Sequence, residues 1–186
     1  MRKLIAAMNM TLDGFCDHTA MIADDEIHRH YTDLLNNADI VLYGRKTYLL
    51  MEYWRSVLEN PTGNKDTDEF AEAIENISKI VYSRTLKDVD WRNTQLKSEI
   101  IKGEILELKQ GSGKDLLVGS PSLIVALTQL GLVDEYQLGL QPTVVGSGLV
   151  LFKDINDRVD LKLLKTKTFG CGAVFLYYEP SNPVSK

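Results

Sequence analysis

Three short segments combine glycine or serine with cationic or hydroxyl side chains directly after an apolar run. They are Gly44-Arg45-Lys46-Thr47, Ser83-Arg84-Thr85 and Gly119-Ser120-Pro121-Ser122. Glycine lets a phosphate come close to the backbone, and arginine offers a planar fork of donors that matches phosphate oxygens. The start of a helix adds free N–H groups. Each segment alone is also typical of an ordinary turn, but the three together predict a ligand with several phosphates, such as a dinucleotide.

Apolar runs alternate with amphipathic stretches along most of the chain, which predicts strands that alternate with helices. Strands are expected at residues 3–9, 39–44, 79–83, 115–119 and 136–141. Helices are expected at residues 25–38, 47–54, 69–76, 100–109 and 121–131, with a surface loop at 60–68. In open parallel sheets, ligands bind beyond the carboxyl ends of the strands. The three segments are therefore expected to meet at one edge of the sheet.

Two helix starts are marked by capping signals. Asp24 is a plausible N-cap for the first helix, and Ser120 is a plausible N-cap for the last, with Pro121 at its first position and Gly131 after its end.

The end of the chain changes pattern. Residues 161–168 and 173–179 are strand-like and flank Gly170 and Gly172, which predicts an antiparallel hairpin. The fold class is therefore α/β, with a mostly parallel central sheet, helices on both faces and an antiparallel C-terminal hairpin. We expect a single domain over residues 1–180 and a tail at 181–186.

Composition limits the possible partners. Apolar residues make up 44% of the 186 residues, and 21 Lys and Arg against 26 Asp and Glu give a net charge of -5. A broad nucleic-acid surface is not expected from this balance, nor is a membrane span. Two cysteines are too few for a disulfide framework, so a reduced, cytoplasmic setting is predicted.

Several common site motifs are missing. No G-x-G-x-x-G follows a predicted strand, and residues 111–114, GSGK, match only part of a P-loop. No Cys/His pattern typical of zinc occurs, so no metal site is expected. The serine-hydrolase motif G-x-S-x-G is also missing.

The chain resembles the dihydrofolate-reductase-like superfamily, and most closely the reductase domain of bifunctional riboflavin-biosynthesis proteins and their free-standing relatives. The resemblance rests on the segments AAMNMTLDGF, ADIVLYGRKTY, KIVYSRTL, DLLVGSPSLIVAL and LGLVDEYQLGLQPTVVGSG, which occur in the family's order. It implies a three-layer fold and an NADPH cofactor. It also implies a homodimer.

The resemblance assigns a part of NADPH to each strand end. The residues expected beside the phosphates are Gly44, Arg45, Lys46 and Thr47; those beside the adenosine ribose and its extra phosphate are Ser83 and Arg84; those at the pyrophosphate are Gly119, Ser120, Pro121, Ser122 and Leu123. Ala7 would lie beside the nicotinamide. The family has Gly-Gly where this chain has Gly119-Ser120, which would make the approach of the pyrophosphate tighter.

The substrate side is less well defined. Thr11, Asp13 and Trp54 are candidates for contact with the substrate, and Asp13 and Glu26 are candidates for catalysis. Asp13 is equally typical of a turn, and Trp54 of packing against the sheet. Folate reductases carry a carboxylate inside the first helix, but neither Asp25 nor Glu26 aligns cleanly with it, and both also suit the start of a helix dipole.

The resemblance predicts an NADPH-dependent reductase like 5-amino-6-(5-phosphoribosylamino)uracil reductase, which transfers hydride to a small imine or carbonyl substrate. Two alternatives stay open. One is reduction of dihydrofolate, and the other is an NADPH-binding module without turnover.

Overall fold

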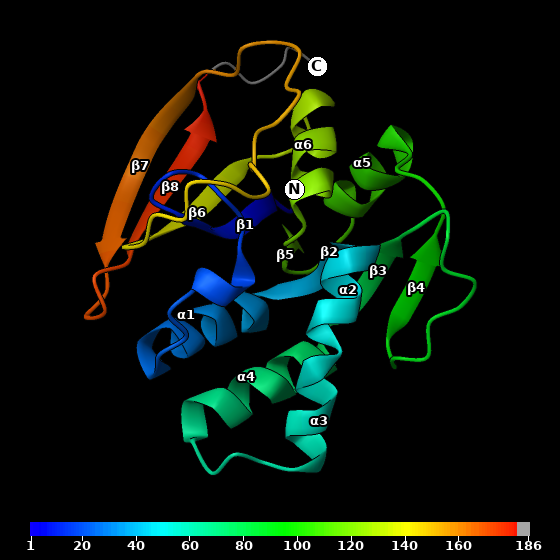
Figure 1. The fold of residues 1–186 in the computed structure, drawn as a ribbon. Coiled ribbons are helices and arrows are strands. Elements are labelled where there is room, and N and C mark those ends of the chain that lie inside the picture. The colour runs from blue at the N-terminus through cyan, green and yellow to red at the C-terminus, as the bar shows by residue number, and fades with distance from the viewer. Residues whose placement is uncertain (182–186) are drawn as a thin grey trace.

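The computed structural model describes residues 1–181, so all of the predicted tail except Ser181 lies outside the described residues. An eight-stranded sheet has the order β4-β3-β2-β5-β1-β6-β8-β7 (Figure 1). The strands are β1 (Leu4–Thr11), β2 (Ala38–Gly44), β3 (Ser78–Tyr82), β4 (Thr94–Lys97), β5 (Asp115–Val118), β6 (Glu135–Gln141), β7 (Leu161–Thr168) and β8 (Val174–Pro180). Neighbours from β4 to β6 are parallel, and β8 is antiparallel to both β6 and β7. The predicted fold class, including the terminal hairpin, is confirmed.

Helices cover both faces of this sheet. They are α1 (Asp25–Asn36), α2 (Arg45–Met51), α3 (Tyr53–Glu59), α4 (Lys65–Asn76), α5 (Lys102–Gln110) and α6 (Pro121–Gln129), with a short 3-10 helix, η1 (His18–Ala20). Figure 1 shows α1, α3 and α4 grouped below the sheet and α5 and α6 above it.

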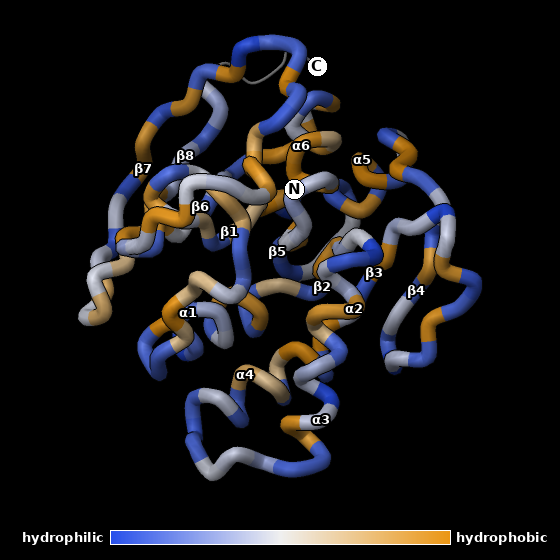
Figure 2. Tube along the Cα trace, viewed as in Figure 1, coloured by the Kyte–Doolittle hydropathy of each residue, from blue (hydrophilic) through white to orange (hydrophobic). Residues whose placement is uncertain are grey.

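Strand alternation separates the core into two layers. Leu4 and Ala6 of β1 pack with α5 and α6, whereas Ile5, between them, packs with α1 and α4. Successive side chains of a strand point to opposite faces, so a strand covered on both sides is apolar throughout. In Figure 2, hydrophobic residues recur along helices such as α1 and α6, whereas the outer loop between α3 and α4 is mostly hydrophilic.

The start of α1 follows the sequence signal. The Asp24 carboxylate accepts a hydrogen bond from the Ile27 N–H at 2.9 Å, which satisfies one of the free donors of the first turn. Ile27 and Leu35 on the inner face of the helix are buried.

Three local predictions were wrong. The helix expected at 47–54 is two helices, α2 and α3, that meet at Glu52. The predicted loop 60–68 is shorter, because the Asn64 side chain accepts from the Thr67 N–H and starts α4 at Lys65. The short, polar strand β4 was not predicted, since its sequence, TQLK, lacks an apolar run.

The hairpin is joined to the parallel strands at Gly139 of β6. A Cβ atom there would lie 2.4 Å from Asn9 Oδ1 and 2.6 Å from the Phe175 ring, so only glycine fits. Phe175 packs in turn with Phe169, Tyr177 and Ile27 of α1. The hairpin therefore closes against both the sheet and the first helix.

Candidate functional site

A cleft of about 1110 Å³ opens at the carboxyl ends of the central parallel strands. Its floor comes from β1, β2, β5 and the end of β3, through Ala7, Gly44, Gly119 and Tyr82 among others. From there it continues between α1, α2, α3 and α4. It has two ends, which differ in chemistry.

The first, called here the strand-tip end, consists of Gly44, Arg45, Lys46, Thr47, Gly119, Ser120, Pro121, Ser122 and Leu123. The second, called here the helix-walled end, consists of Met21, Ile22, Ile27, His28, Tyr31, Leu34, Leu50, Met51, Trp54, Phe70 and Ile74.

At the strand-tip end, the structure brings two of the three predicted segments into contact. The Gly44 N–H donates to Ser120 Oγ at 2.8 Å. A Cβ atom on Gly44 would lie 3.6 Å from Ser122 Oγ, and one on Gly119 would lie 3.3 Å from the Tyr43 ring. Two strand ends that are far apart in the sequence therefore form one compact, glycine-lined surface.

Ser120 occupies the N-cap position of α6, as predicted, but its side chain does not cap the helix. Its buried hydroxyl is used by the Gly44 N–H instead. The first turn of α6 consequently keeps N–H groups that no side chain caps, and its residues Ser122 and Leu123 line the cleft. Free N–H groups at a helix start are suited to a phosphate.

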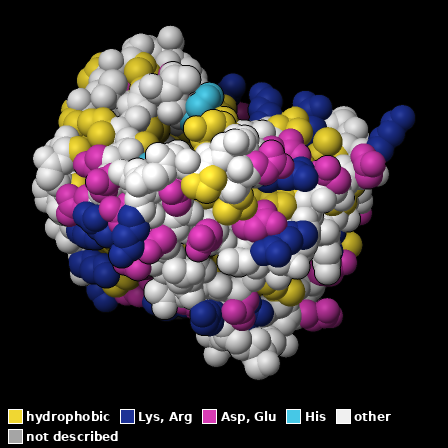
Figure 3. Space-filling model, turned by 90° about the horizontal axis from the view of Figure 1, so that it is seen from below, with side chains coloured by type: hydrophobic (Ala, Val, Ile, Leu, Met, Phe, Trp, Pro, Cys, Tyr) yellow, Lys and Arg dark blue, Asp and Glu magenta, His cyan; other side chains and the backbone are white. Residues whose placement is uncertain are grey.

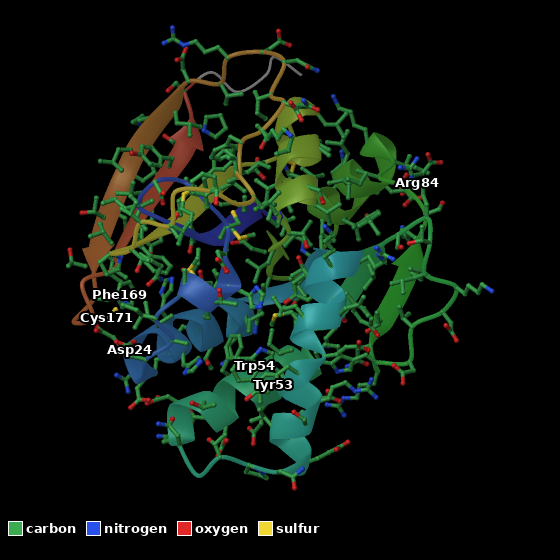
Figure 4. All side chains as sticks on the ribbon, in the orientation of Figure 1. Asp24, Tyr53, Trp54, Arg84, Phe169 and Cys171 are labelled. Carbon is green, nitrogen blue, oxygen red and sulfur yellow. The ribbon has the colours of Figure 1, made fainter. Side chains whose placement is uncertain are left out.

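The third segment does not line the cleft, although its neighbour Tyr82 does. Ser83 Oγ accepts from the N–H groups of Thr85 and Leu86, so it stabilises its own turn. Arg84 is exposed and lies near α5 at the right of Figure 4, well away from Trp54. The predicted contact of Ser83 and Arg84 with the cofactor stays a prediction.

Thr11 and Asp13 also lie outside the cleft lining, and their contacts are with a loop. The Thr11 hydroxyl donates to Asp13 at 2.6 Å, and the Gly146 N–H donates to the same carboxylate at 2.7 Å. The Thr11 hydrogen bond, followed by those from Gly146 and Val145, lowers the pKa of Asp13. These contacts agree with the turn interpretation of Asp13 and give no support to the catalytic one.

The carboxylates of the first turn of α1 point to other elements. Glu26 accepts from the Gly170 N–H at 2.8 Å, and Asp25 accepts from the Asn64 side chain at 2.8 Å. Figure 4 shows Asp24 close to Phe169 and Cys171 of the β7–β8 turn. The structure thus places Glu26 in a contact between α1 and the hairpin, and it brings neither carboxylate to the cleft lining.

Trp54 combines the two roles that the sequence left open. It lines the cleft and packs edge-on against Phe70 of α4, with ring centroids 4.6 Å apart. His28 of α1 lies 5.7 Å from each of these rings. The helix-walled end is therefore an aromatic chamber with one imidazole in its wall.

Sequence reasoning missed most of this chamber. His28 and Tyr31 are three residues apart on α1, which places them on neighbouring positions of one face. Their spacing was a usable signal, but the amphipathic pattern of residues 25–38 predicts only a helix packed on the sheet, with Tyr31 on its inner face and His28 on its polar face.

Burial changes the titration of several cleft residues. It lowers the pKa of His28 below its usual 6.5, against the opposing charges of Asp25, Asp24 and Asp66. It raises the pKa of the Cys16 thiol to about 11. It also raises the pKa of Tyr31, whose hydroxyl is buried without a hydrogen-bond partner among residues 1–181.

Within residues 1–181, no three metal-ligating side chains gather at one point, and no helix is long and apolar enough to cross a membrane. Figure 3 shows the face on the α3 and α4 side, where acidic and basic side chains are interspersed and apolar ones are scattered.

Comparison with known proteins agrees with this architecture. The sequence profile described as the RibD C-terminal domain matches residues 2–175. The chain belongs to the RibD C-terminal domain family. Among individual proteins, the chain is similar to the uncharacterized protein YyaP of Bacillus subtilis (strain 168). The two are 36% identical over 183 residues, which cover 95% of this chain and 94% of that protein.

Solved structures extend the similarity of this RibD C-terminal domain at the level of fold. A putative riboflavin biosynthesis protein from Shewanella sp. PV-4 superposes with a TM-score of 0.72 at 16% identity, covering 97% of this chain and 99% of that one. A dihydrofolate reductase from Enterococcus faecalis, solved with NADP(H), gives a TM-score of 0.63 at 12% identity, with 97% of both chains covered. The predicted dihydrofolate-reductase-like fold is confirmed.

Proposed function

We propose that the protein is an NADPH-dependent reductase of the riboflavin-biosynthesis type, which transfers hydride to a small imine or carbonyl substrate. The observation that carries this proposal is the strand-tip end of the cleft, where Ser120 bonds Gly44 and leaves the first N–H groups of α6 uncapped. Family membership adds the expectation of a reductase.

The residues at the strand-tip end fit a dinucleotide. Gly44 and Gly119 offer backbone without side chains, and the exposed Arg45 and Lys46 supply positive charge beside them. Phosphate oxygens would accept from the N–H groups of Ser122 and Leu123 at the start of α6. Ala7 of β1 lines the floor of the cleft, where it would contact the nicotinamide.

Hydride transfer is the chemistry that a reduced nicotinamide supplies when it is bound. The protein's own part is to hold the two reactants at a reactive distance and to exclude water. The apolar side chains of the helix-walled end provide that dry environment beside the strand tips.

Direct binding measurements test the proposal. NADPH and NADH are titrated into the protein and followed by tryptophan fluorescence and by calorimetry. We expect NADPH to bind in the micromolar range; a failure of both nucleotides to bind below the millimolar range would remove the proposal.

Alanine variants of Arg84 and Lys46 test which of these side chains contacts the extra phosphate of NADPH. If Arg84 contacts it, Arg84→Ala weakens NADPH more than NADH. If Lys46 contacts it, Lys46→Ala does so instead. Lys87→Ala, which removes an exposed cation from the same loop as Arg84, is the control. Equal losses for both nucleotides in the Arg84 variant would refute that assignment.

A further inference from the structure

The helix-walled end of the cleft restricts what the enzyme reduces. We infer that the substrate is an uncharged, planar, conjugated carbonyl or imine compound without a phosphate group, held between aromatic side chains, with His28 as its hydrogen-bond donor. This inference rests on the proposed function and specifies its substrate.

Charge is distributed unevenly along the cleft. Among the described residues, the cations that line it are Arg45, Lys46 and Lys153. The first two lie at the strand-tip end. Lys153 lies on the loop after β6 beside the far end of α6, where the Gln129 side chain donates to the Asp154 carbonyl. No cation lines the helix-walled end, so a phosphate placed there would lose its hydration without gaining an ion pair.

Two arginines lie near the helix-walled end, but neither offers its charge to a ligand in the cleft. Arg29 of α1 is exposed and paired with Asp66 at 2.7 Å, and Arg55 of α3 is paired with Asp90 at 2.9 Å. Neither side chain lines the cleft. Their charge is neutralised on the outer surface and is not directed toward a ligand inside.

In the aromatic wall, the Trp54 ring lies at steep angles to the rings of Phe70 and His28. The ring planes of Trp54 and Phe70 are close to perpendicular, with an interplanar angle of 75°. The ring plane of His28 lies at 85° to that of Trp54. Such an arrangement presents both faces and edges of rings to an incoming molecule. A planar conjugated compound gains from both kinds of contact.

Two polar side chains, His28 and Tyr31, interrupt this otherwise apolar wall. The buried Tyr31 hydroxyl has no hydrogen-bond partner within the part of the chain that the structure describes. One ring nitrogen of His28, Nδ1, lies 3.4 Å from Thr67 Oγ1, which leaves Nε2 for another contact. The Tyr31 hydroxyl has almost no exposed surface, so Nε2 of His28 is the polar atom offered to a substrate with one or two polar atoms and little charge.

The reaction balances with His28 as the proton source. The C=O or C=N carbon gains a hydride, the oxygen or nitrogen gains the proton from the protonated imidazole, and the dinucleotide leaves in its oxidised form. The imidazole then takes a proton from water. The carboxylates that face His28 are Asp24 and Asp25 of its own helix and Asp66 of α4, and all three favour its protonated form.

Two matched probes test the phosphate. One is 5-amino-6-(5-phosphoribosylamino)uracil, whose ribosyl ring opens to an isomeric imine, and the other is the same compound without phosphate. Phenanthrenequinone serves as an apolar, planar probe. With NADPH present, we expect kcat/KM for the phosphate-free compound to equal or exceed that of its phosphorylated partner, and phenanthrenequinone to be reduced.

The result separates this inference from the proposed function. Failure of NADPH to bind would remove both. If NADPH binds but the phosphorylated probe is preferred by about 10-fold or more, or phenanthrenequinone neither binds nor reacts up to its solubility limit, the inference is wrong and the reductase proposal stands.

Variants of the wall test the aromatic contacts. Trp54→Ala should raise KM for phenanthrenequinone by about 3- to 10-fold, the loss expected for one aromatic contact, and leave NADPH binding unchanged. Trp54→Leu keeps more of the packing if the alanine variant does not fold. The control is Leu49→Ala in α2, at a position that is 48% exposed and does not line the cleft. An unchanged KM in both Trp54 variants would overturn the assignment.

Discussion

The strand-tip end and the helix-walled end of the cleft share one cavity but are built from different kinds of structure. The first consists of backbone turns after β2 and β5, which strand pairing and the Gly44–Ser120 hydrogen bond hold together. The second consists of side chains from α1, α3 and α4, whose positions depend on how three helices pack. The difference teaches that a change in these helices should reshape the helix-walled end and leave the strand ends in place.

The largest loss of NADPH affinity is expected when a side chain fills the strand-tip end. Gly44 has ordinary extended backbone angles, φ -83° and ψ 163°, so Gly44→Val is not strained. A Cβ atom there would lie 3.6 Å from Ser122 Oγ and 3.7 Å from the Ser120 side chain, so we expect the two further carbons of valine to narrow the strand-tip end. We expect NADPH affinity to fall about 100-fold, or about 2.7 kcal/mol, with the fold intact by circular dichroism.

Gly103→Ala is the matched control for that variant, since a Cβ atom on Gly103 meets nothing within 4 Å. It should leave NADPH affinity as it is. If Gly44→Val also binds NADPH normally, the dinucleotide does not pass over the strand tips.

A second change tests whether Ser120 belongs to the framework of the site. Ser120→Ala removes the acceptor of the Gly44 N–H in a buried position, and an unsatisfied buried donor costs about 1–3 kcal/mol. We expect a lower free energy of unfolding in urea. Ser122→Ala, at an exposed position two residues later, is the comparison and should be neutral for stability. Equal stability of both variants would mean that the Gly44 contact is not needed.

The dependence of kcat on pH tests the role of His28 at the helix-walled end. Because burial lowers the pKa of His28, its protonated fraction is small at neutral pH and grows as the pH falls below 6.5. The value of kcat for a carbonyl probe should therefore rise toward acid pH in the wild type and lose this dependence in His28→Gln. A structural role alone would change the rate but not the shape of the profile. The same acid limb in His28→Gln would exclude His28 as the proton source.

The smallest effect is expected at Asp13, outside both ends. Its lowered pKa means that the stabilisation of the 145–146 turn is present at neutral pH and is lost as the pH falls through that lowered pKa, below 3.8. Asp13→Asn should lower Tm slightly at pH 7, with the difference from wild type vanishing in acid. Turnover should stay within about twofold of wild type; a large loss of kcat would restore the catalytic interpretation of Asp13.

The strand-tip end was predictable from sequence because it follows a rule of topology. Gly44 and Gly119 each end a buried run, and parallel neighbours bring such ends to one edge. The use of the Ser120 hydroxyl was not predictable, since a serine before Pro121 normally indicates an N-cap. The competing donor, Gly44, lies 76 residues away in sequence.

The helix-walled end was not predictable for a different reason. Ile27, Tyr31 and Leu35 have the spacing of any core-facing helix, and only the angle between α1 and α4 decides which of them line a cavity. Glu26 was named for its residue type, yet its neighbour His28 lies in the wall. Each residue is rotated by about 100° about the helix axis from the one before it, so Glu26 and His28 point in different directions. The direction of the side chain, and not its residue type, decides which of the two lines the cleft.

Burial keeps the Cys16 thiol protonated at neutral pH, which affects how readily it reacts with electrophiles. With a pKa of about 11, about one Cys16 side chain in ten thousand is ionised at pH 7. Quinones and enones alkylate thiolates, not thiols. Electrophiles of this kind that enter the cleft should therefore modify Cys16 much more slowly than they would modify a cysteine of ordinary pKa.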